Sequence, residues 1–314
     1  VARANELCNE LGLDVISTAG TIAFAMECFE HGLIGPGDTD GLELRFGNAA
    51  ALLELVVRIA DRSGFGELLA QGSRRAAEAI GGDAPSFAMQ VKGQELPMHE
   101  PRGKVGVGLG YATNEAGADH LVGFHDPLFV KADSVPFRSV ADLGISEPTG
   151  VLDLGEKKVR IWHTSERWNS AEKVLGLCFF GPAPRSLIQV ADMLTAVRAA
   201  TGWDVTVEEL LEVGERAVNM ARVFNVREGF TRADDRLPDR LFTPLENGAL
   251  AGTSIARDDF EQAITDLYLL KGWDPTTGVP TEARLRKLGL EWTAGESVAG
   301  GASGGEGTSA DPGR

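Results

Sequence analysis

The sequence predicts a mainly α-helical protein, and three observations support this fold class. Apolar residues recur at three- and four-residue spacing in runs along most of the chain, as they do on the buried face of a helix. The segment Thr206-Val-Glu-Glu209 has the pattern of a capping box, which marks the start of a helix. Segments with the two-residue alternation of a half-buried strand are few, so we expect helices to form the core.

The predicted helices follow one another along the chain. Two short helices are expected between about residues 4 and 33, on either side of Gly12-Leu-Asp14, and Gly35-Pro-Gly37 ends the second. Further helices are predicted over residues 46–59, 65–80, 152–168, 186–200, 206–224, 258–270 and 281–288.

Two helical domains and a tail are expected. Residues 87–96 lose the helical period and are rich in turn residues, so we place a domain boundary near residues 83–86. This gives a first helical domain over residues 1–86 and a second over residues 87–293. Residues 294–314 consist mostly of Gly, Ser, Ala and Glu, which bury too little apolar surface to offset the entropy lost on ordering. We predict that this last segment is a disordered tail.

Composition argues against several classes of function. The 314 residues carry a formal net charge of −16, which argues against nucleic acid and anionic lipid as partners because both attract clustered Lys and Arg. No apolar stretch approaches the roughly 18 residues needed to cross a bilayer, so no membrane association is expected. The three cysteines, Cys8, Cys28 and Cys178, define no disulfide framework, and we expect a reducing, cytoplasmic compartment.

Residues 103–110, Gly-Lys-Val-Gly-Val-Gly-Leu-Gly, form a glycine-rich segment that resembles a phosphate cradle, in which glycines let backbone N–H groups approach an anion. The segment does not match the Gly-x-x-x-x-Gly-Lys-Ser/Thr pattern. It also lacks the strand–loop–helix context and the following acidic residue of a dinucleotide site. We therefore interpret it as a structural loop that threads between packed elements.

The histidines and cysteines do not by themselves define a catalytic site. None of the five histidines forms a His-x-x-x-His or His-Glu-x-x-His pair, which argues against a zinc hydrolase, and no Gly-x-Ser-x-Gly elbow occurs. His120 and His125 lie close together, but histidines in loops are usually surface or hydrogen-bonding residues. Cys178 lies in the apolar run Val174–Phe180, which is typical of a buried, inert thiol. An iron–sulfur cluster needs about four thiolates, so the chain alone cannot build one.

Several segments, taken together and in order, resemble the aldehyde:ferredoxin oxidoreductase family. Cys8-Asn-Glu-Leu-Gly-Leu-Asp14 is similar to the first of the family's two pterin-binding motifs, which has the pattern Asp-x-x-Gly-Leu-(Cys/Asp). Leu175-Gly-Leu-Cys178 resembles the second motif. Other family-like segments are residues 66–73, 91–97, 100–103, 111–120, 227–232, 234–238 and 272–274. The resemblance spans nearly everything from Cys8 to Leu290.

This resemblance implies two packed helical domains of the family's carboxy-terminal type, with the amino-terminal β-rich pterin domain missing. It also implies a tungsten or molybdenum atom held by two molybdopterins (tungstopterin), a nearby [4Fe–4S] cluster and electron export to ferredoxin. By motif position, the residues that would contact the two pterins are Asn9, Gly12, Leu13 and Asp14 for the first and Leu177 for the second. Cys178 would supply the fourth thiolate of the cluster. His120 occupies the position of the family's active-site histidine, where a hydrogen-bonding or proton-transferring group suits aldehyde oxidation.

The chain departs from the family pattern at four points, one of which is Glu115, where small or amide residues are common in the family. The leading Asp of the pterin motif is Asn9 in the first motif and Lys173 in the second. Asn still offers a carbonyl oxygen to the pterin N–H groups, whereas Lys is only a donor, so nearby Glu172 is the candidate acceptor. The family's Cys-x-x-Cys-x-x-x-Cys trio and amino-terminal pterin domain are absent, and we expect them upstream of Val1.

Two hypotheses follow from the resemblance. The first is that the chain is the carboxy-terminal part of an oxidoreductase that oxidises an aldehyde to a carboxylate, with ferredoxin as electron acceptor. Its expected partners are ferredoxin, a small aldehyde, the missing amino-terminal domain and a second copy of the chain. The chain alone is expected to be inactive. The alternative is a non-catalytic scaffold or interaction subunit derived from this family, which Lys173 and the missing cysteine trio favour.

Overall fold

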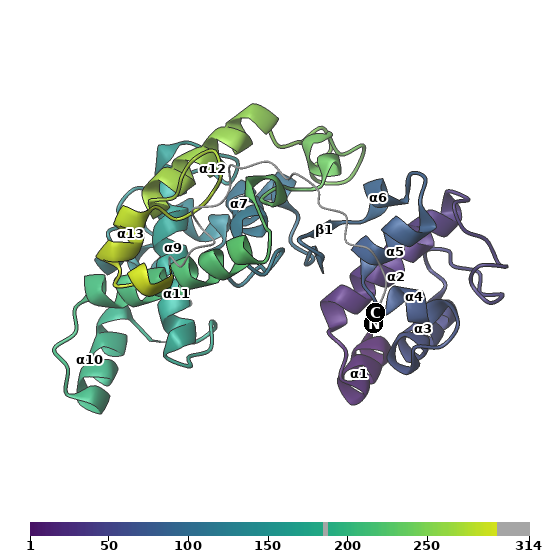
Figure 1. The fold of residues 1–314 in the computed structure, drawn as a ribbon, viewed down its shortest axis with the longest axis horizontal. Helices are drawn as coiled ribbons and strands as arrows, with labels where there is room; N and C mark the ends of the chain where they lie inside the picture. The colour runs from purple at the N-terminus through teal and green to yellow at the C-terminus, as the bar shows by residue number, and fades with distance from the viewer. Residues whose placement is uncertain (185–187, 294–314) are drawn as a thin grey trace, which may run out of the picture.

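The computed structural model describes residues 1–184 and 188–293, and it confirms the mainly α-helical prediction. Figure 1 shows two groups of helices with the strand β1 between them. The first helical group comprises α1 (Ala2–Leu11), α2 (Val15–Glu30), α3 (Ala49–Asp61), α4 (Phe65–Leu69), α5 (Ser73–Ile80) and α6 (Ala84–Phe87). The second helical group comprises α7 (Val105–Thr113), α8 (Val135–Arg138), α9 (Glu156–Val174), α10 (Val190–Thr201), α11 (Val207–Arg227), α12 (Arg257–Lys271) and α13 (Glu282–Lys287).

Short elements complete the described chain. The 3-10 helices are η1 (Pro101–Gly103), η2 (Asp126–Phe129), η3 (Ala141–Leu143), η4 (Arg232–Asp234), η5 (Asp239–Phe242) and η6 (Glu291–Thr293). The strands β1 (Gln90–Val91) and β2 (Gln94–Glu95) pair antiparallel, with Gln90 opposite Glu95 and Val91 opposite Gln94.

Local signals set the helix boundaries in the first helical group. The carboxylate of Asp14 begins α2 by accepting a hydrogen bond from Ser17 N at 2.6 Å, and Asn48 begins α3 in the same way. The prediction of one helix over residues 65–80 is wrong, because Gly72 has a φ of +84° and separates α4 from α5. The core of this group includes Ile22, Phe24, Leu44, Leu55, Leu69 and Ala76.

The second helical group is built around the long helices α9 and α11. The predicted capping box is confirmed at the start of α11, where Thr206 Oγ1 accepts from Glu209 N and Glu209 Oε2 accepts from Thr206 N. The two helices pack closely at Gly214, where an added Cβ would lie 1.8 Å from the carbonyl oxygen of Arg167. Only glycine leaves room for this approach of two helix backbones.

The glycine-rich segment forms helix α7 rather than the predicted structural loop. Its glycines let neighbouring side chains approach the helix backbone, and a Cβ at Gly110 would lie 2.3 Å from the indole of Trp162 on α9. Asp126 accepts hydrogen bonds from the N–H groups of Gly106 at 3.0 Å and Val107 at 3.2 Å, and it also pairs with buried Lys158. A protein carboxylate therefore satisfies the start of this helix, where a phosphate cradle would place its anion.

The β hairpin makes buried polar contacts to both helical groups. On the side of the first group, Glu95 Oε1 accepts hydrogen bonds from Thr21 Oγ1 at 3.1 Å and Ser73 N at 2.7 Å. On the side of the second group, Lys92 Nζ lies 2.6 Å from Asp235 Oδ1, and both side chains are almost completely buried. The hairpin therefore joins the two groups through charged side chains that are removed from water.

Two expectations about domain organisation are not tested by the described residues. The domain boundary near residues 83–86 stays a prediction, and the predicted disordered tail over residues 294–314 lies outside the described part of the chain. Within residues 1–184 and 188–293, no single helix has the length and apolar composition to cross a membrane. Only the pair α1 and α2, bent by 117° at their junction, meets those two criteria together.

Candidate functional site

The two predicted pterin motifs have the same backbone structure, although they lie in different helical groups. The first closes α1: Gly12 has a φ of +71°, and Leu13 N–H donates back to the carbonyl of Cys8 at 2.8 Å. The second closes α9: Gly176 has a φ of +73°, and Leu177 N–H donates to the carbonyl of Glu172 at 2.9 Å. Each is a helix C-terminal turn with a left-handed glycine, which explains why the motif needs Gly before Leu.

Both turns leave open space in front of their glycines. A Cβ added to Gly12 or to Gly176 would meet no heavy atom within 4 Å. Asn9 and Asp14 are exposed at the first turn, where Leu13 is partly buried. The positive φ values, rather than crowding, therefore require glycine at these two positions.

Cys178 is exposed, so the expectation that its apolar setting buries an inert thiol is wrong. Leu177 is also exposed, and its neighbours Val174 and Phe180 expose 56% and 57% of their surfaces. An apolar run normally indicates core, but here it lies on the surface of the described chain. Cys8 and Cys28 are buried, and burial raises the pKa of the Cys28 thiol to about 11. Cys178 is thus the accessible thiol of the three.

His120 belongs to a cluster of three imidazoles around a lysine. Lys104 Nζ lies 2.6 Å from His99 Nδ1 and 3.0 Å from His125 Nδ1. The ring of His99 packs against that of His120 with centroids 4.9 Å apart, and His125 Nε2 lies 2.8 Å from the carbonyl oxygen of His120. The fold thus places two further histidines and a cation beside the predicted catalytic residue.

Two contacts connect the second motif with the segment around His120. Lys173 Nζ lies 3.7 Å from Asp119 Oδ2, next to His120 in the chain. Asn169 on α9 donates from Nδ2 to the carbonyl of Leu121 at 3.4 Å. These contacts place the end of α9, which Leu177 and Cys178 follow in the chain, beside residues 119–121 in the second helical group. Asn9, Gly12, Leu13 and Asp14 lie together at the junction of α1 and α2 in the first group.

Two buried oxygen atoms at the end of α9 have no hydrogen-bond partner in the described chain. They are Asn169 Oδ1 and Glu172 Oε1, from side chains that expose 1% and 2% of their surfaces. Burial raises the pKa of Glu172 to about 8, well above the usual range of a carboxyl group. Buried polar groups usually have partners, so these atoms mark unmet hydrogen-bonding capacity beside the second motif.

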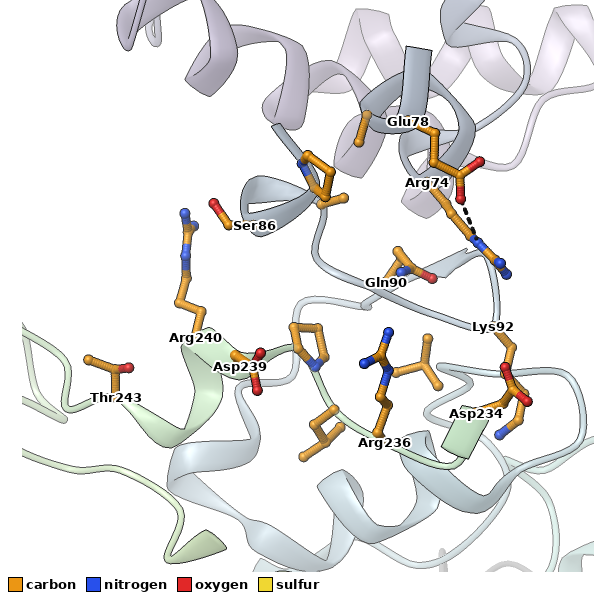
Figure 2. A pocket seen from close by; sticks show the side chains of 16 residues that line it. Arg74, Glu78, Ser86, Gln90, Lys92, Asp234, Arg236, Asp239, Arg240 and Thr243 are labelled. Carbon is orange, nitrogen blue, oxygen red and sulfur yellow. Dashed lines mark hydrogen bonds and ion pairs between the residues drawn. The ribbon is translucent and has the colours of Figure 1, made fainter. Parts of the chain in front are cut away.

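A cavity of about 540 Å³ lies elsewhere, between the first and second helical groups (Figure 2). Its charged side chains are largely paired: Arg74 with Glu78 at 3.2 Å, and Arg240 with Glu27 at 2.8 Å. Asp239 pairs with Arg257, which is not among the residues that line the cavity. None of the predicted site residues lines this cavity.

Sequence reasoning missed His99, Lys104 and Asp119 as members of the site. His99 and Lys104 precede His120 by 21 and 16 residues, and no short spacing links them to it. These residues come close to the segment around His120 only in the folded chain, so their spacing in the sequence gives no sign of it. Among residues 1–184 and 188–293, no group of three or more His, Cys, Asp or Glu side chains is arranged to hold a metal ion.

Most of this chain is similar in sequence to known proteins. A family model described as aldehyde ferredoxin oxidoreductase, domains 2 & 3, matches residues 1–290. The tungsten-containing aldehyde ferredoxin oxidoreductase of Pyrococcus furiosus is 36% identical over 293 residues, which are 92% of this chain and 45% of that protein. The WOR-like subunit of an aliphatic sulfonate oxidoreductase from the same organism is 28% identical over 90% of this chain and 41% of its own length.

A solved structure has the same fold. The active site complex BamBC of benzoyl coenzyme A reductase, with bound 1,5-dienoyl-CoA, superposes with a TM-score of 0.69 at 24% identity. The match covers 93% of this chain and 46% of that one, so the chain spans about half the length of the relatives it matches. The chain therefore belongs to the aldehyde ferredoxin oxidoreductase family, in which it corresponds to the carboxy-terminal domains 2 and 3.

Proposed function

We propose that this chain is the carboxy-terminal part of an oxidoreductase that oxidises an aldehyde to a carboxylate with ferredoxin as the electron acceptor. The observation that carries the proposal is the surface at the end of α9. There an exposed cysteine directly follows a glycine turn of the pterin-motif type. Lys173, at the same helix end, contacts Asp119, the residue before His120. The relatives that are tungsten-containing aldehyde ferredoxin oxidoreductases support the same reaction.

The described residues fit a bis-pterin tungsten centre and a [4Fe–4S] cluster that are completed by other parts of a longer protein. Cys178 offers one accessible thiolate, and a cluster of this kind needs about three more. The unpartnered oxygens of Asn169 and Glu172 are acceptors beside the second turn, and a pterin has amino and ring N–H groups to donate. When bound, these groups would supply two-electron substrate oxidation and single-electron transfer to ferredoxin.

The chain's own residues would position these groups and manage protons. In this proposal Asn9, Gly12, Leu13 and Asp14 contact one pterin through the turn after α1, and Leu177 contacts the other through the turn after α9. The open space in front of Gly12 and Gly176 leaves each turn accessible to a flat ligand. His120 would donate or accept a proton at an imidazole nitrogen facing the substrate.

Analysis of the purified full-length protein tests the proposal. We expect tungsten or molybdenum together with pterin, and aldehyde-dependent reduction of ferredoxin or of a viologen dye. The 314-residue chain alone should bind neither metal nor pterin stably and should show no turnover. A full-length preparation free of metal and pterin would overturn the proposal.

One observation favours a second candidate, a non-catalytic scaffold. Lys173 stands where the pterin motif has its carboxylate, and its ammonium contacts Asp119 instead of offering an acceptor. A scaffold of this kind would keep the two helical groups and bind a partner without metal or pterin. The metal and pterin analysis separates the two candidates, because only the enzyme contains both groups.

A further inference from the structure

Lys104 contacts the ring nitrogens of two histidines beside His120. An ammonium group donates up to three hydrogen bonds and accepts none, so the nitrogen atoms that it contacts must be acceptors. Its Nζ atom lies 2.6 Å from His99 Nδ1 and 3.0 Å from His125 Nδ1. An ammonium at Lys104 thus requires both Nδ1 atoms to lack a proton, which leaves each ring neutral with its proton on Nε2.

A second contact shows that Nε2 of His125 is protonated, in agreement with this tautomer. His125 Nε2 lies 2.8 Å from the carbonyl oxygen of His120, and a carbonyl oxygen can only accept. Nε2 of His125 must therefore carry the proton. The ring of His125 thus connects the ammonium of Lys104 on one side with the backbone of His120 on the other.

His99 holds the ring of His120 from another direction. The two rings pack with centroids 4.9 Å apart and planes tilted by 36°. The backbone of His99 is itself fixed, because Tyr111 donates from its hydroxyl to the His99 carbonyl at 3.3 Å. Tyr111 is completely buried in α7, so the cluster is anchored to the core of the second helical group.

We infer that Lys104 is a positioning residue for His120. Its ammonium holds His99 and His125 as neutral, Nε2-protonated rings, which fix the ring and the backbone of His120 respectively. The inference concerns the reaction only through the proposed function, in which His120 meets the substrate. The tautomers of His99 and His125 do not depend on that function.

The tautomers can be measured directly. In the full-length protein labelled with 15N-histidine, two-bond nitrogen–proton spectra distinguish Nε2-protonated, Nδ1-protonated and doubly protonated rings. Single His→Gln variants assign the signals. We expect His99 and His125 to show the Nε2-protonated pattern. An Nδ1-protonated or doubly protonated ring at both positions would overturn the inference, and this wild-type spectrum decides even if no Lys104 variant folds.

Variants at Lys104 test the dependence on the ammonium. In Lys104→Met the signals of His99 and His125 should shift away from the single tautomer, while those of His31 and His163 stay unchanged. Lys104→Arg keeps donors and should restore much of the wild-type pattern. Lys131→Met removes an exposed lysine of the same helical group and should change nothing. Unchanged His99 and His125 signals in Lys104→Met would contradict the inference.

Kinetics add a readout that separates positioning from binding. With aldehyde as substrate, Lys104→Met should lower kcat by roughly tenfold to a hundredfold with little change in KM, because a misplaced catalytic group costs rate. If the full-length protein lacks metal and activity, the proposed function fails, whereas the tautomer spectra still decide the role of Lys104. If activity is present and Lys104→Met leaves kcat unchanged, the positioning role fails.

Discussion

Single residues at the end of α9 combine burial with ionisable chemistry. Glu172 exposes 2% of its surface, and burial raises the pKa of its carboxyl group to about 8, whereas its usual value is 4.5. Lys173, the next residue, is half exposed and contacts Asp119. Glu172 and Lys173 are adjacent in the sequence, but the carboxyl group is removed from water and the ammonium group is in contact with it.

Replacement of Glu172 should change how stability depends on pH. The folded chain binds this proton more tightly than the unfolded chain, so the stabilisation is complete below about pH 4.5 and is lost as pH rises through about 8. The difference between the two pKa values corresponds to at most about 5 kcal/mol. We expect Glu172→Gln to lose less stability than wild type between pH 6 and pH 9, as measured by urea unfolding.

The control for this prediction lies on the same helix. Glu156 is exposed and pairs with Arg160 on the surface of α9, so Glu156→Gln should leave the pH dependence nearly unchanged. Equal pH slopes for wild type and Glu172→Gln would show that Glu172 is ionised in the folded chain at neutral pH.

For single residues, the sequence predicted the glycine turn between the first two helices but not the exposure of Cys178 to solvent. The turn at Gly12 separates α1 from α2, as the sequence predicts, whereas α9 continues to Val174, past its predicted end at residue 168, and closes at Gly176. The exposure of Cys178 was not predictable, because an apolar run looks the same in a core and on a surface. The roles of the remaining predicted site residues stay predictions.

At the scale of elements, hydrophobic periodicity located most helices and tertiary contacts decided the exceptions. The long helices α9 and α11 have apolar spacing that is visible in the sequence, and the capping box of α11 is visible as well. Helix α7 was not predicted, because each glycine in a helix costs about 1 kcal/mol relative to alanine. Close packing against Trp162 outweighs that cost, and such packing becomes visible only in the folded chain.

The packing of α7 gives a prediction at this scale. A Cβ at Gly110 would lie 2.3 Å from the indole of buried Trp162, so Gly110→Ala forces the two helices apart. We expect a loss of stability of at least about 2 kcal/mol, as found for overpacked cores. Denaturant unfolding measures this loss.

Gly37→Ala is the matched control, because a Cβ at Gly37 would meet nothing within 4 Å. It should change stability by less than about 0.5 kcal/mol. A Gly110→Ala variant as stable as wild type would show that α7 and α9 are not packed as described.

At the scale of the whole molecule, the β hairpin joins the two helical groups that carry the two halves of the proposed site (Figure 1). Lys92 and Glu95, three residues apart, are each buried against a different group. The sequence indicated only a turn-rich segment here. It could not show which carboxylates and ammonium groups would pair, because Lys92 and Asp235 are far apart in the chain.

Removal of the hairpin's cation should weaken the whole structure. Lys92 Nζ contacts Asp235 and donates to the carbonyl of Ala112 at 2.6 Å, and burial lowers the pKa of this amine. Lys92→Met leaves Asp235 buried with Arg222 as its remaining cation. We expect a loss of about 2 kcal/mol, because the buried Ala112 carbonyl and Asp235 Oδ1 both lose the donor that Lys92 supplied. Thermal unfolding that shows a loss below about 1 kcal/mol would contradict this account.

We propose that Cys178 is the cluster ligand that this chain contributes to a tungstopterin enzyme. The most direct test compares iron and sulfide content and the electron paramagnetic resonance of the reduced full-length protein with those of Cys178→Ser. Val174→Ala, at the exposed end of α9, is the control. The account predicts that the cluster signal is lost in Cys178→Ser and kept in Val174→Ala. A full cluster signal in Cys178→Ser, or none in the wild type, would contradict it.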